Sequence, residues 1–144
     1  MLKKLLLILF LIQPAFAQQE KGITYNAIVT RVIDGDTVAI EAKWVPAPLK
    51  PEISIRIYGV DTPEVKGRAQ CQTEAILGAK ASEYTKKLVS GAKDKKVVLL
   101  KWDKYGGRIL GDIILDNKSL REALIQNGYA KEYYGDAKTS WCSK

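Results

Sequence analysis

Segments of alternating apolar and polar residues constrain the fold of this chain most, together with one stretch of helical spacing. Two β-branched and aromatic-rich segments, 22–33 and 37–44, flank the turn sequence DGD and predict a β-hairpin. Three prolines make 45–52 a loop, and residues 53–60 form the third predicted strand. Three strands therefore precede the first helix.

An amphipathic helix is predicted over residues 73–90. Apolar residues recur there at spacings of four, three and four from Leu77 to Leu88, and Gly91 ends the pattern. This stretch separates the three N-terminal strands from the remaining elements.

Two further strands and a second helix follow. Residues 95–102 and 108–115 have strand character and flank the turn sequence DKYGG. Ser119 and Glu122 then form a capping box, which predicts a short helix ending at Gly128.

The resulting order is three strands, a helix, two strands and a helix. This order predicts a β-rich α+β domain: a five-stranded OB-fold barrel with a helix between strands 3 and 4 and a short C-terminal helix. OB-folds bind oligonucleotides and oligosaccharides, but the fold does not determine the function.

The N-terminus has the pattern of a secretory signal. Lys3 and Lys4 precede the apolar run 5–12, and the small-residue sequence AFA ends at Ala17. We expect residues 1–17 to be removed as a signal peptide, leaving 18–144 as a single domain. The protein would then be exported to the periplasm or the medium, with no stable membrane association after cleavage. The alternative is an uncleaved membrane anchor.

Two cysteines, Cys71 and Cys142, lie outside the signal. An even number of cysteines in an exported protein predicts a disulfide, because oxidising compartments let such bonds persist. The alternative, a metal site with two cysteine ligands, lacks a third soft ligand.

The chain contains no histidine. This excludes Ser-His and Cys-His nucleophilic catalysis, imidazole acid–base chemistry and every histidine-ligated metal site. Any metal should therefore be a hard cation held by oxygen ligands, such as calcium, magnesium or manganese.

The formal net charge of +7 indicates a polyanionic partner. Removal of the two lysines of the signal would leave +5, which is still basic for a small domain. Nucleic acid, anionic lipid and acidic glycan all fit this charge, as does a basic surface without a partner.

Four carboxylates follow two of the predicted strands. Asp34 and Asp36 lie in the first hairpin turn, and Asp61 and Glu64 follow the third strand. In a barrel these groups could gather at one rim, where a divalent cation would neutralise their mutual repulsion. The alternative is a pair of ordinary polar turns.

Two arginines complete a constellation that favours phosphodiester hydrolysis. Arg56 lies within the third strand, and Arg108 follows the glycine turn. A guanidinium fork fits phosphate oxygens in bidentate geometry, and a hard cation beside it would polarise the same group. A surface ion pair of little energetic weight is the alternative.

Four ordered segments resemble the thermonuclease family, the staphylococcal-nuclease-like enzymes. They are VIDGDTV (32–38), IRIYGVDTPE (55–64), DKYGGRILGDI (103–113) and NGYAK (127–131), and the similarity extends over residues 28–134. The resemblance implies an OB barrel and calcium-dependent cleavage of DNA and RNA to 3′-phosphorylated products.

The resemblance also implies a calcium site and a general base. Asp36 and Asp61 match the family's calcium-binding carboxylates, with the Thr62 backbone carbonyl as a further ligand and Asp34 at the edge of the site. Glu64 matches the residue usually assigned as the general base, which holds a water for in-line attack on phosphorus.

The remaining family positions concern the phosphate and the nucleotide. Arg56 and Arg108 match the two catalytic arginines, which bind phosphate and stabilise charge in the transition state. Lys104, Tyr105 and Tyr134 resemble nucleotide-binding positions.

Two local features differ from the family pattern. The turn before Arg108 has one additional glycine, which could shift that side chain, and the proline loop at 45–52 is an insertion. The competing interpretation is a catalytically silent OB-fold module that binds nucleic acid. Such a module should have lost one or more of the acidic or arginine positions, whereas this chain retains them. We expect a monomeric enzyme.

Overall fold

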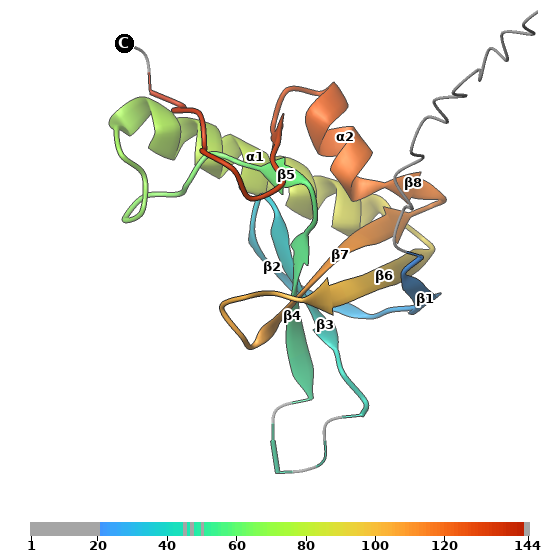
Figure 1. Cartoon of the computed structure of the whole chain (residues 1–144). Helices are drawn as coiled ribbons and strands as arrows, with labels where there is room; N and C mark the ends of the chain where they lie inside the picture. Colours follow the sequence, from blue (N-terminus) through green and yellow to red (C-terminus); the bar gives the residue numbers. More distant parts are fainter. Residues whose placement is uncertain (1–20, 45, 47, 50, 143–144) are drawn as a thin grey trace, which may run out of the picture.

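The computed structural model describes residues 21–44, 46, 48–49 and 51–142. The predicted signal peptide, 1–17, lies outside the described residues. A strongly bent mixed sheet forms the centre of the domain, and two helices pack on one side of it (Figure 1). Neither helix in the described ranges is long and apolar enough to cross a membrane.

The main sheet contains seven strands, of which only β4 and β7 pair in parallel. Along the hydrogen-bonded path the strands follow one another as β1 (Ile23–Asn26), β6 (Lys95–Trp102), β7 (Arg108–Leu115), β4 (Glu52–Ile57), β3 (Thr37–Glu41) and β2 (Val29–Asp34), with β8 (Lys118–Ser119) paired to β7. Each of the five segments predicted as a strand contains strand structure, so the prediction of a β-rich α+β fold is confirmed. The expected number of five strands is too low.

The prediction of one continuous strand over residues 22–33 was wrong. This segment is two strands, because β1 pairs with β6 whereas β2 pairs with β3. The Ala27 amide donates to the Lys95 carbonyl at 2.9 Å, and the Glu41 amide donates to the Ile28 carbonyl at 2.9 Å. The chain thus passes from one edge of the sheet to the other between Ala27 and Ile28. The sheet is OB-like, but its hydrogen-bond ladder is not closed.

The third predicted strand, 53–60, also divides. β4 ends at Ile57, and a turn with Gly59 at a φ of +77° starts β5 (Val60–Asp61). β5 leaves the main sheet and pairs antiparallel with β9 (Lys131–Glu132). Strands of two residues are too short for an alternating pattern, so the sequence did not predict them. The turn carries Asp61 away from the sheet and towards the C-terminal segment.

Helix α1 (Gln72–Gly91) confirms the predicted helix and supports both acidic turns. The Thr85 hydroxyl donates to the Gly35 carbonyl at 2.7 Å, which holds the first hairpin turn on the helix. A Cβ at Gly78 would lie only 2.3 Å from the Glu64 carbonyl oxygen. Glycine is therefore required at position 78 for the loop that carries Glu64 to lie directly on α1.

Helix α2 (Leu120–Gln126) begins at the predicted capping residue. The Ser119 hydroxyl accepts from the Glu122 amide at 3.2 Å, and Gly128 has a φ of +75° after the helix. Leu120 and Leu124 are at most 1% exposed and extend the barrel core. Burial of each such side chain contributes about 1.5–3 kcal/mol, which fixes the helix on the barrel.

A disulfide joins Cys71 to Cys142, as the sequence predicts. Cys71 is also the N-cap of α1, where its sulfur accepts from the Glu74 amide at 3.4 Å. The bond therefore ties the C-terminal segment to the start of α1, and Figure 1 shows this red segment running along the helix.

Candidate functional site

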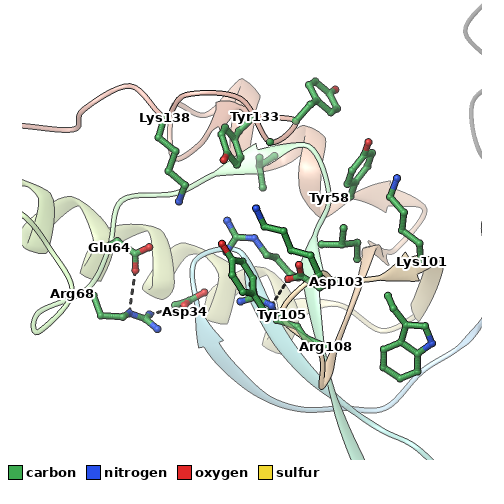
Figure 2. A pocket seen from close by; sticks show the side chains of 17 residues that line it. Asp34, Tyr58, Glu64, Arg68, Lys101, Asp103, Tyr105, Arg108, Tyr133 and Lys138 are labelled. Carbon is green, nitrogen blue, oxygen red and sulfur yellow. Dashed lines mark hydrogen bonds and ion pairs between the residues drawn. The ribbon is translucent and has the colours of Figure 1, made fainter.

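A cleft of about 480 Å³ opens beside β4 and β7, within the size range of small-molecule sites (Figure 2). Six of the predicted site residues line it, although they lie far apart in the sequence. They are Arg56, Glu64, Lys104, Tyr105, Arg108 and Tyr134. The three predicted metal-binding residues, Asp36, Asp61 and Thr62, are 3–5% exposed.

Asp36 lies in the β2–β3 turn and is hydrogen-bonded through both oxygens. Its Oδ1 is 3.2 Å from Arg56 Nη1 and accepts from the Thr37 hydroxyl at 3.0 Å. Its Oδ2 accepts from the Thr62 amide at 3.3 Å, which brings the first acidic turn against the second. Burial raises the pKa of Asp36 to about 6, and the Arg56 guanidinium opposes this only in part.

This raised pKa predicts a pH-dependent stability. The ordinary value is 3.8, so between about pH 4 and pH 6 the folded protein keeps a proton that the unfolded chain has lost. In chelator-containing buffer, the contribution of Asp36 to the free energy of unfolding should fall by on the order of 3 kcal/mol as pH rises through this window. Urea unfolding of the unmodified chain and of Asp36→Asn checks this, because the variant should lack this part of the decline. Parallel pH profiles for the two proteins would contradict it.

Asp61 is covered by the C-terminal segment. Its Oδ1 is 2.7 Å from Lys138 Nζ, and its Oδ2 accepts from the Trp141 indole N–H at 3.0 Å. Neither partner was among the predicted site residues. The disulfide was the one sequence signal that could have placed this segment near the second acidic turn.

Glu64 faces the cleft and forms an ion pair with Arg68. Arg68 Nε lies 3.1 Å from Glu64 Oε2, and its Nη2 lies 2.8 Å from Asp34 Oδ2. Arg68 therefore joins the two acidic turns, as the dashed lines in Figure 2 show. The Glu64 backbone is held independently, since its amide donates to the Glu74 carboxylate at 3.2 Å.

Arg108 begins β7 and is held at the cleft by Asp103. Its Nε donates to Asp103 Oδ2 at 2.6 Å, and Asp103 is 8% exposed. In the turn before Arg108, Gly106 and Gly107 take φ values of +68° and +66°, a backbone conformation that glycine adopts readily. Arg108 itself pairs with Ser54 of β4.

Exposed aromatic side chains also line the cleft. Tyr105 is 75% exposed, and Lys104 Nζ lies 5.0 Å from its ring centroid. Tyr134 is 57% exposed and contacts Tyr58 edge to face at a centroid distance of 5.6 Å. Trp102 also lines the cleft and is 65% exposed. Tyr58 and Trp102 were missed, because each lies within a strand pattern that accounts for it without a site.

Comparison with known proteins identifies the family. Residues 54–141 match the sequence profile described as staphylococcal nuclease homologue. The chain belongs to the staphylococcal nuclease family. The predicted resemblance is thereby confirmed, and the matched region includes β4 from Ser54 onward, the second acidic turn, the glycine turn and the tail up to Trp141.

Curated relatives with nuclease names support the same assignment. Endonuclease YhcR of Bacillus subtilis (strain 168) is 36% identical over 118 residues, which are 76% of this chain and 9% of that protein. Endonuclease YncB of the same strain is 33% identical over 117 residues, covering 76% of this chain and 48% of that protein. Thermonuclease of Staphylococcus hyicus is 34% identical over 113 residues, covering 75% and 58%. The chain thus spans less than two thirds of the length of each of these relatives.

Nucleases of the staphylococcal nuclease family generally depend on a metal ion. The carboxylate and carbonyl oxygens of this site are ligands that suit a hard cation. In the two acidic turns, four carboxylates (Asp34, Asp36, Asp61 and Glu64) face three cationic side chains (Arg56, Arg68 and Lys138). The raised pKa of Asp36 has the same origin, a buried carboxylate that its cationic neighbour does not fully compensate. Within the described part of the chain, no three acidic, cysteine or histidine side chains form a metal-binding group. Asp36, Asp61 and the Thr62 carbonyl would therefore need water or substrate oxygens to complete a coordination shell.

Proposed function

We propose that this chain is a calcium-dependent nuclease that hydrolyses phosphodiester bonds in DNA and RNA and leaves 3′-phosphates. The observation that carries the proposal is the convergence of Arg56, Glu64 and Arg108 on one cleft beside the buried carboxylates. The names of the relatives support a nuclease, and the donor set of Asp36, Asp61 and Thr62 supports a hard cation.

Each residue has a defined part in this reaction. Arg56 and Arg108 bind the scissile phosphate through their guanidinium groups and stabilise the charge that develops on its oxygens. Glu64 accepts a proton from the attacking water. Hydrolysis that leaves a 3′-phosphate breaks the bond between phosphorus and the 5′ oxygen, which leaves with a proton. Calcium, when bound, supplies Lewis-acid polarisation of the phosphate.

The surrounding contacts position these groups. Asp36 and Asp103 hold the two guanidinium groups at the cleft, because each carboxylate pairs with one arginine. Arg68 restrains the Glu64 carboxylate beside the phosphate site. Lys104, Tyr105 and Tyr134 provide charge and aromatic faces for the nucleotide, since stacking on an exposed ring tolerates any base.

The place of action follows from the predicted signal. We propose that residues 1–17 are removed during export and that 18–144 act as a monomer in the periplasm or the medium. Mass spectrometry of the exported protein would give the mature N-terminus, which we expect at Gln18.

Zymography separates the enzyme from a silent OB-fold module most directly. Gels containing DNA or RNA should clear at the position of the protein in calcium and remain intact in chelator. A silent module would retard the same nucleic acids in a mobility-shift assay and clear neither gel. Analysis of the product ends should show 3′-phosphate, whereas 5′-phosphate products would reject the proposed direction of cleavage.

Arg56→Lys tests the guanidinium requirement. The ammonium keeps the charge but loses the planar fork, so the turnover number should fall by about 10²–10³-fold. Lys87→Arg is a matched control, because this exposed residue of α1 does not line the cleft. Nuclease rates at saturating calcium on variants with unchanged circular dichroism check the expectation. Near-normal turnover of Arg56→Lys would show that one positive charge at this position is enough.

A further inference from the structure

The C-terminal segment supplies a cation to the proposed metal site. Lys138 Nζ lies 2.7 Å from Asp61 Oδ1, and the Trp141 indole N–H occupies Oδ2 at 3.0 Å. The Asp61 side chain is only 7% exposed. Both oxygens of this carboxylate are therefore engaged by the tail, and a metal that binds Oδ1 must take the place of the lysine ammonium.

Three contacts hold the tail in this position independently of Lys138. The disulfide joins Cys142 to the start of α1. On β9, Lys131 Nζ contacts the Ser140 carbonyl at 3.0 Å and lies 4.0 Å from the Trp141 ring centroid. The backbone around Trp141 is thus anchored from both sides.

The Lys138 side chain is less constrained than this anchored backbone. It is 45% exposed, and Figure 2 shows it extending from the C-terminal segment towards the cleft that it lines. A long, partly solvated lysine can leave Asp61 for water without unfolding the tail. Its ammonium is consequently a displaceable partner, whereas the Trp141 contact is part of the framework.

We propose that Lys138 is a tethered counterion of Asp61 that competes with calcium and so sets the calcium affinity of the site. This inference rests on the proposed function, because it takes Asp61 as a calcium ligand. In the calcium-free protein the ammonium neutralises a carboxylate that would otherwise be buried with only the neutral Trp141 indole as its partner. When calcium binds, the ammonium moves to solvent. The free energy needed to break its ion pair with Asp61 makes calcium binding weaker than it would be without the lysine.

Isothermal titration calorimetry with Ca²⁺ tests the competition without relying on catalysis. Lys138→Met keeps an unbranched side chain but removes the charge, and its dissociation constant for Ca²⁺ should fall about tenfold, which corresponds to about 1.4 kcal/mol. Lys138→Arg retains a cation and should bind Ca²⁺ within about threefold of the unmodified chain. Lys66→Met removes the same charge from an exposed residue that is not a partner of Asp61, and should leave the affinity unchanged.

The possible outcomes separate this inference from the function on which it rests. Tighter Ca²⁺ binding by Lys138→Met alone supports the competition. Unchanged or weaker binding by Lys138→Met, with normal binding by the unmodified chain, overturns the inference and leaves the proposed function intact. An equal gain in Lys66→Met also overturns it, because net charge would then explain the effect. Failure of the unmodified chain to bind Ca²⁺ at millimolar concentration contradicts the proposed cofactor and the inference together.

Discussion

Replacing Glu64 with glutamine should lower the turnover number at saturating calcium by about 10²–10⁴-fold, the contribution of a positioned general base. The amide is nearly isosteric with the carboxylate but accepts no proton from water. The Glu64 backbone rests on Gly78 and donates to Glu74, so the exchange should leave the loop in place. Nuclease rates across a calcium titration measure the effect.

The calcium dependence distinguishes a base from a metal ligand. A general base acts only on the proton transferred in the transition state. The calcium concentration that gives half-maximal activity should therefore be unchanged in Glu64→Gln, while the maximal rate falls. Glu83→Gln is the matched control, because Glu83 is exposed on α1 and does not line the cleft. Near-normal turnover in Glu64→Gln would remove the general-base assignment. If Arg56→Lys were also near normal, the segment IRIYGVDTPE would be a strand and a turn without catalytic function.

Removal of the disulfide should lower the free energy of unfolding by about 4 kcal/mol. The bond closes a loop with a sequence separation of 71, and the chain-entropy account gives this magnitude for a loop of that length. The suitable variant is Cys71→Ser with Cys142→Ser, because a serine hydroxyl can still cap α1 in place of the Cys71 sulfur. Urea unfolding under oxidising conditions measures the loss.

Two controls isolate the effect of the cross-link. The unmodified chain measured in reductant should lose a similar free energy, whereas the double serine variant should not respond to reductant. The main effect of the double substitution should be on the free energy of unfolding. Its effect on the turnover number of the folded protein should be smaller, since neither sulfur belongs to the cleft. Equal stability of the two proteins would show that the contacts of Lys131 and Trp141 hold the tail without the bond.

Local patterns in the sequence were sufficient for the regular elements. Helix α1 was predicted within one residue at each end, since apolar residues recur at helical spacing from Leu77 to Leu88 and Gly91 ends the pattern. Strands β6 and β7 were predicted over the residues that they occupy, 95–102 and 108–115, because a turn with two glycines separates two runs rich in Val, Ile and Leu.

Prediction failed where a strand changes its partners. The segment 22–33 reads as one strand because residues on both sides of Ala27 have the same β-branched character, and the change of neighbour from β6 to β3 leaves no mark in composition. The two-residue strands β5 and β9 are defined by pairing between residues seventy or more positions apart. Such pairing depends on how segments distant in the chain pack together, which no local window contains.

The same distinction between local pattern and long-range packing applies to the candidate site. Residue types and their spacing were enough to establish which chemistry is available: no histidine, carboxylates after two strands, two arginines, and motifs specific enough to indicate the family. Which of these groups lie in contact became known from the three-dimensional fold. It pairs Asp36 with Arg56, places Arg68 between Asp34 and Glu64, and brings Lys138 onto Asp61. The physical reason is that residue type sets a group's charge and hydrogen-bonding capacity, whereas its partners and its burial are set by the packing of segments distant in the chain.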